Sequence, residues 1–272
     1  KCPSSSCFHL VFFLSVPKVT KLIYFNRIIV YLQRMKEFLK KIVKSFPIDF
    51  TKNQIYDRQT RQVIAKVCRH DSNCIDVGCH KGEVMDIIFR CAPEGKHFGF
   101  EPIPSMYESL KKKYHGTNCE IINLALSEQK GTTSFNYVIS NPAYSGMKER
   151  KYEKSDEVIE KIDVKTDRMD NVIPITLPIS LIKIDVEGAE YQVLKGATGI
   201  LEKQRPVIIF EHGLGASDFY GTTPAMIFDL FDEFGYKIST MKSWLGSGGS
   251  FSKAEFEDQF NRQVDYYFIA FP

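Results

Sequence analysis

The chain has 272 residues, of which 43% are hydrophobic, so it can bury a sizeable core, and its formal net charge is +3. The excess positive charge comes from residues 1–34, which carry five basic residues and no acidic one, whereas the remainder carries 31 basic and 33 acidic residues. This balance argues against a general nucleic-acid-binding surface. Seven cysteines without a C-x-x-C pair indicate neither a zinc site nor a disulfide framework, and we expect reduced thiols in a cytoplasmic protein.

Residues 1–34 do not share the pattern of the rest of the chain. Pro17, Lys18 and Lys21 interrupt their apolar stretches, so no run approaches the roughly 20 residues that cross a bilayer. We interpret Met35 as the natural start and 1–34 as a leader or non-native extension, with a signal peptide as the alternative. The expectation is a single domain over 35–272 without stable membrane association.

From Met35 onward, predicted helices and strands alternate, which indicates a mostly parallel sheet covered by helices on both faces. An insert at about 132–164 has the alternating pattern of an antiparallel excursion that carries a loop. Two final strands, with no helix between them, are expected to close the sheet as an antiparallel pair. The predicted helices are 54–69, 82–91, 104–114 and 223–234, and the predicted strands are 73–77, 96–100, 119–127, 181–184, 207–210, 235–239 and 264–270.

A glycine-bearing turn follows the first of these strands. Gly78 ends the strand where the backbone must turn, and Gly82 lets the next helix begin close to a ligand. Glu101 ends the second strand 25 residues after Asp76, near the separation at which an acidic side chain meets ribose hydroxyls in open α/β sheets. The third glycine of a pyrophosphate-binding loop is missing, so S-adenosylmethionine fits better than NAD. The alternative is that both glycines only shape an ordinary turn.

Acidic residues also follow the later strands. Asp185 and Glu187 come after the strand 181–184, and Glu211 and His212 end the strand 207–210. Because ligands bind at the carboxyl ends of strands in such sheets, we expect these side chains to face the site.

These motifs together resemble the FkbM family of S-adenosylmethionine-dependent methyltransferases. The resemblance covers about residues 70–215, and the Asp-Val-Glu-Gly-Ala-Glu run at 185–190 is its most specific element. It implies a seven-stranded class I methyltransferase fold, a Rossmann-like α/β sandwich, and O-methylation, often of sugar hydroxyls in glycans or natural products. The run Thr166 to Asp170 departs from the family's Thr-Leu-Asp sequence, which leaves the helix start there open.

The resemblance and the motifs together assign roles to individual residues. Glu101 is expected to bind the ribose, Leu124 and Ala125 to lie at the adenine edge, and Asp76 to orient the turn or the cofactor's amino group. The complete expected cofactor-binding set is Asp76, Gly78, His80, Gly82, Glu101, Leu124, Ala125 and Asp185.

His212 is the first candidate for the general base because its ordinary pKa lies near neutrality. Asp185 and Glu187 complete the expected catalytic set. A structural role for His212 is an equal alternative, and a third hypothesis is a divalent cation held by these acids and His212, although no metal is assigned. Tyr144 and Ser145 are the candidate acceptor-binding residues, in a loop at 141–154.

Two functional classes remain open. The chain is either a catalytic O-methyltransferase acting on a small-molecule or glycan hydroxyl, or a cofactor-binding interaction module of the same fold. An NAD-dependent oxidoreductase is a further, less favoured class. The sequence indicates neither the acceptor nor the oligomeric state.

Overall fold

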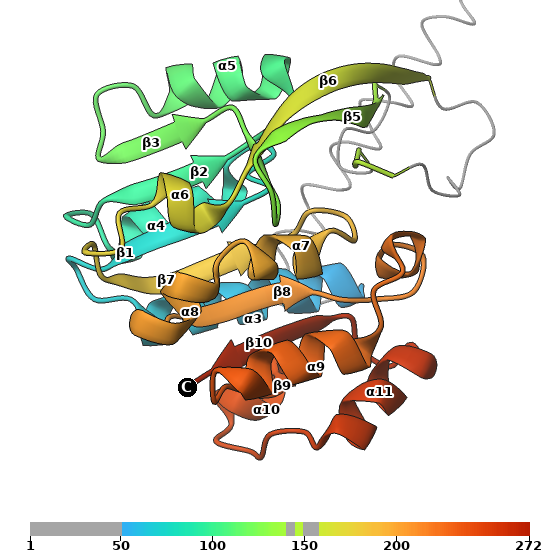
Figure 1. Ribbon diagram of the computed structural model, residues 1–272. Coiled ribbons are helices and arrows are strands. Elements are labelled where there is room, and N and C mark those ends of the chain that lie inside the picture. Colours follow the sequence, from blue (N-terminus) through green and yellow to red (C-terminus); the bar gives the residue numbers. More distant parts are fainter. Residues whose placement is uncertain (1–50, 140–144, 149–157) are drawn as a thin grey trace, which may run out of the picture. The chain divides into compact units, whose positions relative to one another are not determined.

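The structure is a computed structural model that describes residues 51–139, 145–148 and 158–272, and within it Ile55–Pro272 form one compact unit. Its centre is a seven-stranded sheet in the order β3-β2-β1-β7-β8-β10-β9, in which β10 runs antiparallel to both of its neighbours (Figure 1). The strands are β1 (Asn73–Val77), β2 (His97–Phe100), β3 (Cys119–Ile122), β7 (Ile179–Ile184), β8 (Val207–Glu211), β9 (Lys237–Thr240) and β10 (Tyr267–Phe271). The predicted parallel sheet with a closing antiparallel strand is confirmed.

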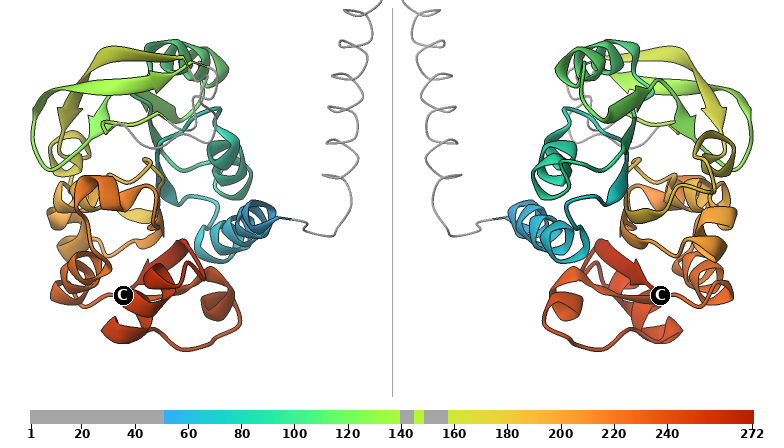
Figure 2. Two further views of the ribbon diagram at one scale, coloured as in Figure 1. Left: turned by 90° about the vertical axis from the view of Figure 1, so that its right-hand side faces the viewer. Right: turned by 90° about the vertical axis from the view of Figure 1, so that its left-hand side faces the viewer.

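Helices cover both faces of this sheet, as Figure 2 shows with the sheet between them. One face packs against α6 (Met169–Val172), α7 (Glu190–Lys195), α8 (Thr198–Lys203), α9 (Pro224–Glu233) and α11 (Lys253–Asn261). The other face packs against α3 (Lys52–Val67), α4 (Glu83–Cys91), α5 (Pro104–Lys113) and α10 (Met241–Leu245). A short 3₁₀ helix, η2 (Ser217–Tyr220), follows β8.

Strand alternation decides which side chains enter each of the two apolar layers. In β7, Ile182 and Ile184 pack in the layer of α7 to α9, whereas Leu181 packs in the opposite layer. Lys183 alternates with the two isoleucines and is nevertheless buried. A lysine at this depth requires partners of opposite charge.

The region expected to be an antiparallel insert lies in a second sheet. In it β4 (Ala125–Leu126) and β5 (Gly131–Val138) flank β6 (Ile159–Asp167), and β5 and β6 pair antiparallel. The strand predicted over 119–127 was wrong as one element, because β3 ends at Ile122 and β4 belongs to this second sheet. Asn123 stands at the break, where its side chain donates to the carbonyl oxygens of Glu101 and Pro102 instead of continuing a ladder.

The prediction that no helix separates the last two strands was also wrong. Both α10 and α11 lie between β9 and β10. They are short, and polar caps start them: the Thr240 hydroxyl accepts from Ser243 N–H, and Ser252 with Glu255 forms a capping box. The capping box Ser-x-x-Glu was visible in the sequence as a helix start.

The expected domain start at Met35 and the leader 1–34 lie outside the described residues. Within the part of the chain that the structure describes, no helix has the length and apolar character needed to cross a membrane.

The helix start left open near Thr166 is at Met169. The Asp170 carboxylate reaches across to the first turn of α8, where it accepts hydrogen bonds from Gly199 N–H (3.0 Å) and Ile200 N–H (3.1 Å). It therefore caps a helix that follows it by almost thirty residues.

Replacing Asp170 with alanine should lower the free energy of unfolding by about 1–2 kcal/mol, because two helical N–H groups lose their acceptor. Chemical denaturation measures this. Asp170→Asn keeps an acceptor oxygen and should lose less, and Asp229→Ala, which breaks an exposed ion pair with Lys253, should change stability by less than about 0.5 kcal/mol. Equal losses in all three variants would contradict the capping role.

Candidate active site

The glycine turn after β1 is held by the end of β2. Gly78 and Cys79 N–H both donate to the Phe100 carbonyl oxygen, at 3.0 and 3.1 Å. Gly78 has a φ of 78°, and a β-carbon there would overlap the carbonyl oxygen of Asp185, which directly follows β7. The glycine is therefore required by the packing of two strand ends, whatever ligand binds beside it.

Gly82 is the second glycine of the turn and also has a positive φ, of 76°. A β-carbon at this position would collide with the Tyr114 hydroxyl, which donates to the Gly82 carbonyl oxygen. The N-terminus of α4 thus starts directly at the turn, as the sequence predicted.

Glu101 points back into this turn. Its carboxylate accepts hydrogen bonds from His80 N–H (2.9 Å) and Ile103 N–H (3.0 Å), one on each oxygen. The residue is only 4% exposed, and burial raises its pKa to about 7 despite these two hydrogen bonds, which lower it. Each oxygen keeps a lone pair, so the carboxylate fits the two hydroxyl donors of a ribose diol.

A buried charge network links β1 with β7. The Lys183 ammonium lies 3.3 Å from Asp185 Oδ2 and 3.7 Å from Asp76 Oδ1, and it donates to the Gly78 carbonyl oxygen at 3.4 Å. Burial lowers the pKa of Lys183, but the two carboxylates raise it by more, so the lysine stays charged. Asp76 is fully buried, and burial raises its pKa although Lys183 opposes this.

The turn after β7 is ordered by Glu190. One of its carboxylate oxygens accepts from both Val186 N–H and Gly188 N–H, each at 3.1 Å. This closes the turn tightly enough that Glu187 adopts a φ of 60° and Gly188 one of 107°. Burial raises the pKa of Glu190 to about 7. Glu190 therefore shapes the turn that carries Glu187, the other glutamate of the Asp-Val-Glu-Gly-Ala-Glu run.

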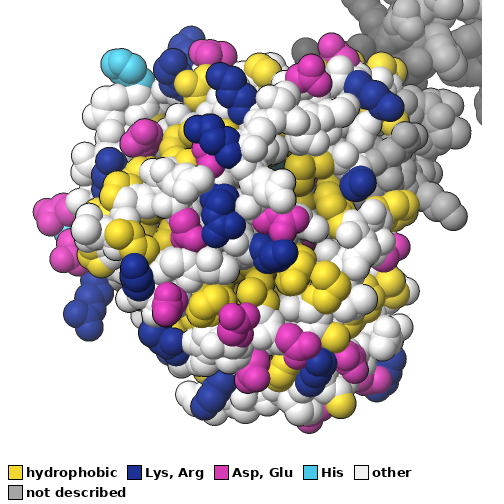
Figure 3. All heavy atoms as spheres, in the orientation of Figure 1, with side chains coloured by type: hydrophobic (Ala, Val, Ile, Leu, Met, Phe, Trp, Pro, Cys, Tyr) yellow, Lys and Arg dark blue, Asp and Glu magenta, His cyan; other side chains and the backbone are white. Residues whose placement is uncertain are grey.

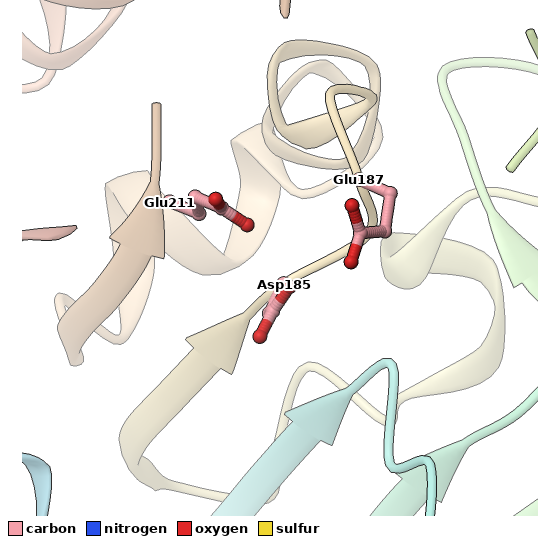
Figure 4. A group of neighbouring side chains, drawn as sticks. All are labelled: Asp185, Glu187 and Glu211. Carbon is pink, nitrogen blue, oxygen red and sulfur yellow. The ribbon is translucent and has the colours of Figure 1, made fainter. Parts of the chain in front are cut away.

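Figure 4 shows the carboxyl groups of Asp185, Glu187 and Glu211 turned toward one another at the ends of β7 and β8. One oxygen from each lies within 4.8 Å of the others. Burial and the neighbouring Asp185 raise the pKa of Glu211 well above its usual range, whereas Lys183 and the Tyr267 hydroxyl hold that of Asp185 low against burial. Of these two carboxyl groups, Asp185 is therefore the one whose ionised form the surroundings favour. These three oxygen ligands are of the type that a hard divalent cation accepts, but the acids alone do not establish a metal site.

His212 does not join this group. Its ring lies between Phe256 and Phe260, with centroid distances of 5.8 and 4.8 Å, on the layer opposite Lys183. The side chain is fully buried, and neither ring nitrogen has a hydrogen-bond partner among the described residues. Burial lowers its pKa to about 4. The placement favours the structural alternative over the role of general base.

The remaining expected site residues lie around the turn and the insert. Leu124 is half-buried, Ala125 is buried, and His80 is half-buried with a positive φ. The Ser145 hydroxyl is buried and accepts from Val138 N–H, while Tyr144 lies outside the described residues. Gly146, next to Ser145, approaches both Glu187 and Tyr220, so this part of the insert borders Glu187, one of the three acids.

Two contributors to the site were missed from the sequence. Glu190 was read only as part of a motif, and Tyr267 was not considered although its hydroxyl donates to Asp185. Tyr267 begins β10, and an antiparallel strand reaches the carboxyl edge of the sheet with its first residue instead of its last. A prediction that considers only the last residues of strands therefore misses Tyr267.

Comparison with known proteins identifies the architecture. A family model described as "Methyltransferase FkbM domain" matches residues 76–238. The chain belongs to this family. The seven-stranded sheet with its reversed strand β10 confirms the expected class I methyltransferase fold. The family match supports S-adenosylmethionine as the cofactor. The Glu101 carboxylate and the turn that carries Gly78 fit that cofactor.

A curated relative, "Methyltransferase sdnD" of Sordaria araneosa, is 28% identical over 152 residues, which cover 45% of this chain and 59% of that protein. Among solved structures, a TehB-like SAM-dependent methyltransferase from Corynebacterium glutamicum has a TM-score of 0.40 at 11% identity, covering 88% of this chain and 94% of that one. The plantazolicin methyltransferase BpumL in complex with S-adenosylhomocysteine has a TM-score of 0.39 at 16% identity, covering 87% and 97%.

The raised pKa of Glu101, about 7, makes cofactor affinity depend on pH if its ionised form binds the ribose. The dissociation constant of S-adenosylhomocysteine should fall by up to about tenfold between about pH 6 and about pH 8, as the carboxylate becomes ionised. Isothermal titration calorimetry measures this. Glu101→Gln should bind more weakly and lose the slope; a slope retained in this variant would assign it to another group.

The raised pKa of Glu190 has a consequence for stability. The pKa of this carboxyl group is 4.5 in the unfolded chain and about 7 in the folded protein, so the unfolded chain releases the proton at lower pH. The free energy of unfolding therefore falls as the pH rises from about 4.5 to about 7. Glu190→Gln keeps an acceptor without the charge and should melt at or above the wild-type temperature near pH 8. Glu190→Ala leaves two N–H groups without an acceptor and should be less stable than Glu190→Gln by about 1–3 kcal/mol at every pH. Equal melting temperatures for the two variants would contradict this role.

Proposed function

We propose that this chain transfers the methyl group of S-adenosylmethionine to a hydroxyl group of a sugar, glycan or natural product. The supporting observation is that the glycine turn, which fits the cofactor, lies next to the three acids. Asp185 N–H donates to the Val77 carbonyl oxygen at 3.1 Å, immediately before Gly78. A methyl group carried at the turn would therefore lie beside a carboxylate.

The cofactor supplies a methyl group that its sulfonium already activates, so the protein mainly has to bind and align the reactants. We assign Glu101 to the ribose hydroxyls, Leu124 and Ala125 to the adenine edge, and Gly78 and Gly82 to close backbone approach. Each glycine has a positive φ and close contacts, so the packing of the chain itself fixes the geometry of the turn.

Asp185 is the proposed acceptor of the hydroxyl proton. Its side chain is 26% exposed, unlike His212, and its lowered pKa keeps it ionised. A carboxylate with a low pKa is a weak base, so it accepts the hydrogen bond of the acceptor hydroxyl, aligns the oxygen and receives the proton as the methyl group is transferred. Alignment then accounts for most of the acceleration.

The surroundings of Asp185 support a hydroxylated acceptor. Glu187 and Glu211 add hydrogen-bonding carboxyl groups next to it, and Ser145 lies in the part of the insert that borders Glu187. The face seen in Figure 3 mixes basic and acidic side chains, without the single-sign stripe that binds a nucleic-acid backbone. A small-molecule or glycan acceptor without nucleic acid therefore remains our proposal.

The test has two parts. Calorimetry with S-adenosylmethionine and S-adenosylhomocysteine measures cofactor binding, and transfer of a labelled methyl group to a panel of sugars, glycans and hydroxylated natural products measures catalysis. Asp185→Asn should bind S-adenosylhomocysteine within about threefold of wild type but transfer methyl at least about 100-fold more slowly. His212→Asn should keep most of the activity of the protein that remains folded. Binding without transfer to any acceptor would instead support the non-catalytic binding module.

A further inference from the structure

We propose that Tyr267 is a positioning residue that fixes the Asp185 carboxylate for the transfer, in concert with Lys183. The proposal rests on the function proposed above and adds a residue beyond the segment 76–238 that the family model matches. The geometry of three neighbouring strands supports it.

Tyr267 reaches Asp185 from the reversed strand. It lies opposite Glu211 in the register of β10 and β8, and β8 lies next to β7, which ends just before Asp185. The Tyr267 hydroxyl donates to Asp185 Oδ2 across β8. The side chain thus crosses one strand to reach the carboxylate.

The same oxygen is held from the other side by Lys183, whose ammonium lies 3.3 Å from Oδ2. A phenol and an ammonium converging on one carboxylate oxygen set the rotation of the carboxyl group, and a buried site strengthens both interactions. Because the two oxygens are joined in one carboxyl group, fixing Oδ2 also fixes the direction of Oδ1, and we assign Oδ1 to the acceptor hydroxyl.

The position of Tyr267 is itself fixed by α3. The Tyr56 ring stacks on the Tyr267 ring at 5.2 Å with an interplanar angle of 30°, and the Tyr56 hydroxyl donates to Asp265 Oδ1 at 2.7 Å. Tyr266 N–H donates to the same hydroxyl at 3.4 Å. Tyr56 thus holds both the Tyr267 ring and the two residues before it, so the role of these contacts is preorganisation.

Tyr267→Phe is the test variant because it keeps the ring and its stacking on Tyr56 while it removes the hydroxyl. With the acceptor found above, kcat should fall by about tenfold, as expected for one hydrogen bond to a charged group, while KM and the dissociation constant of S-adenosylhomocysteine stay within about twofold. Tyr236→Phe is the matched control: it also removes a buried hydroxyl, which donates to the Pro206 carbonyl oxygen away from the site, and kcat should not change.

A double variant separates positioning from general destabilisation. If Tyr267 acts through Asp185, Tyr267→Phe combined with Asp185→Asn should be no slower than Asp185→Asn alone. If the double variant lost kcat by the product of the two single losses, or if Tyr267→Phe left kcat unchanged, the inference would be overturned.

The contact is also tested without any activity. In a double-mutant cycle on the free energy of unfolding, Tyr267→Phe and Asp185→Asn should be non-additive, because they remove the same hydrogen bond. Additive losses would overturn the inference even if no acceptor were found. A wild-type protein that shows this coupling but transfers no methyl group would overturn the proposed function alone.

Discussion

The close approach of β1 and β7 at their carboxyl ends is the constraint on which the site depends. Gly78 is tolerated there because it has no β-carbon to meet the Asp185 carbonyl oxygen, and Lys183 bridges the same two strands through Asp76 and Asp185. A buried ion network of this kind contributes little net stability but is costly to break. Here it fixes the distance between the glycine turn and the three acids to which we assign the acceptor.

Most of the fold could be predicted from sequence because its central strands carry strong local signals. The run Ile75 to Val77 is apolar and ends in glycine, and the observed β1 has the predicted bounds. The mispredicted elements lie where contacts with distant segments or polar caps outweigh the local apolar pattern. The strand expected over 119–127 breaks because Asn123 bonds to the end of β2, and α10 and α11 depend on polar caps more than on apolar periodicity.

The sequence predicted which strand ends carry the candidate site, but not which face of the sheet each side chain occupies. Asp185 and Glu211 were expected at the edge where the structure places them, and Glu101 points into the expected turn. His212 follows Glu211 directly, and adjacent strand residues point to opposite faces, so its ring enters the apolar layer beneath α11. Two hydrogen bonds join segments that are distant in sequence, and no local pattern contains them. They are the bond of Asp170 to α8 and the bond of Tyr267 to Asp185.

The reversal of β10 has a consequence for protein engineering. A fragment trimmed to 76–238 would leave β8 without its lateral neighbour, exposing unpaired backbone groups along Ile208 to Phe210, and would discard the phenol that touches Asp185. Chimaeras that exchange acceptor specificity should therefore take their crossover points outside Tyr56 and Tyr267, so that α3 and β10 stay together with the proposed site.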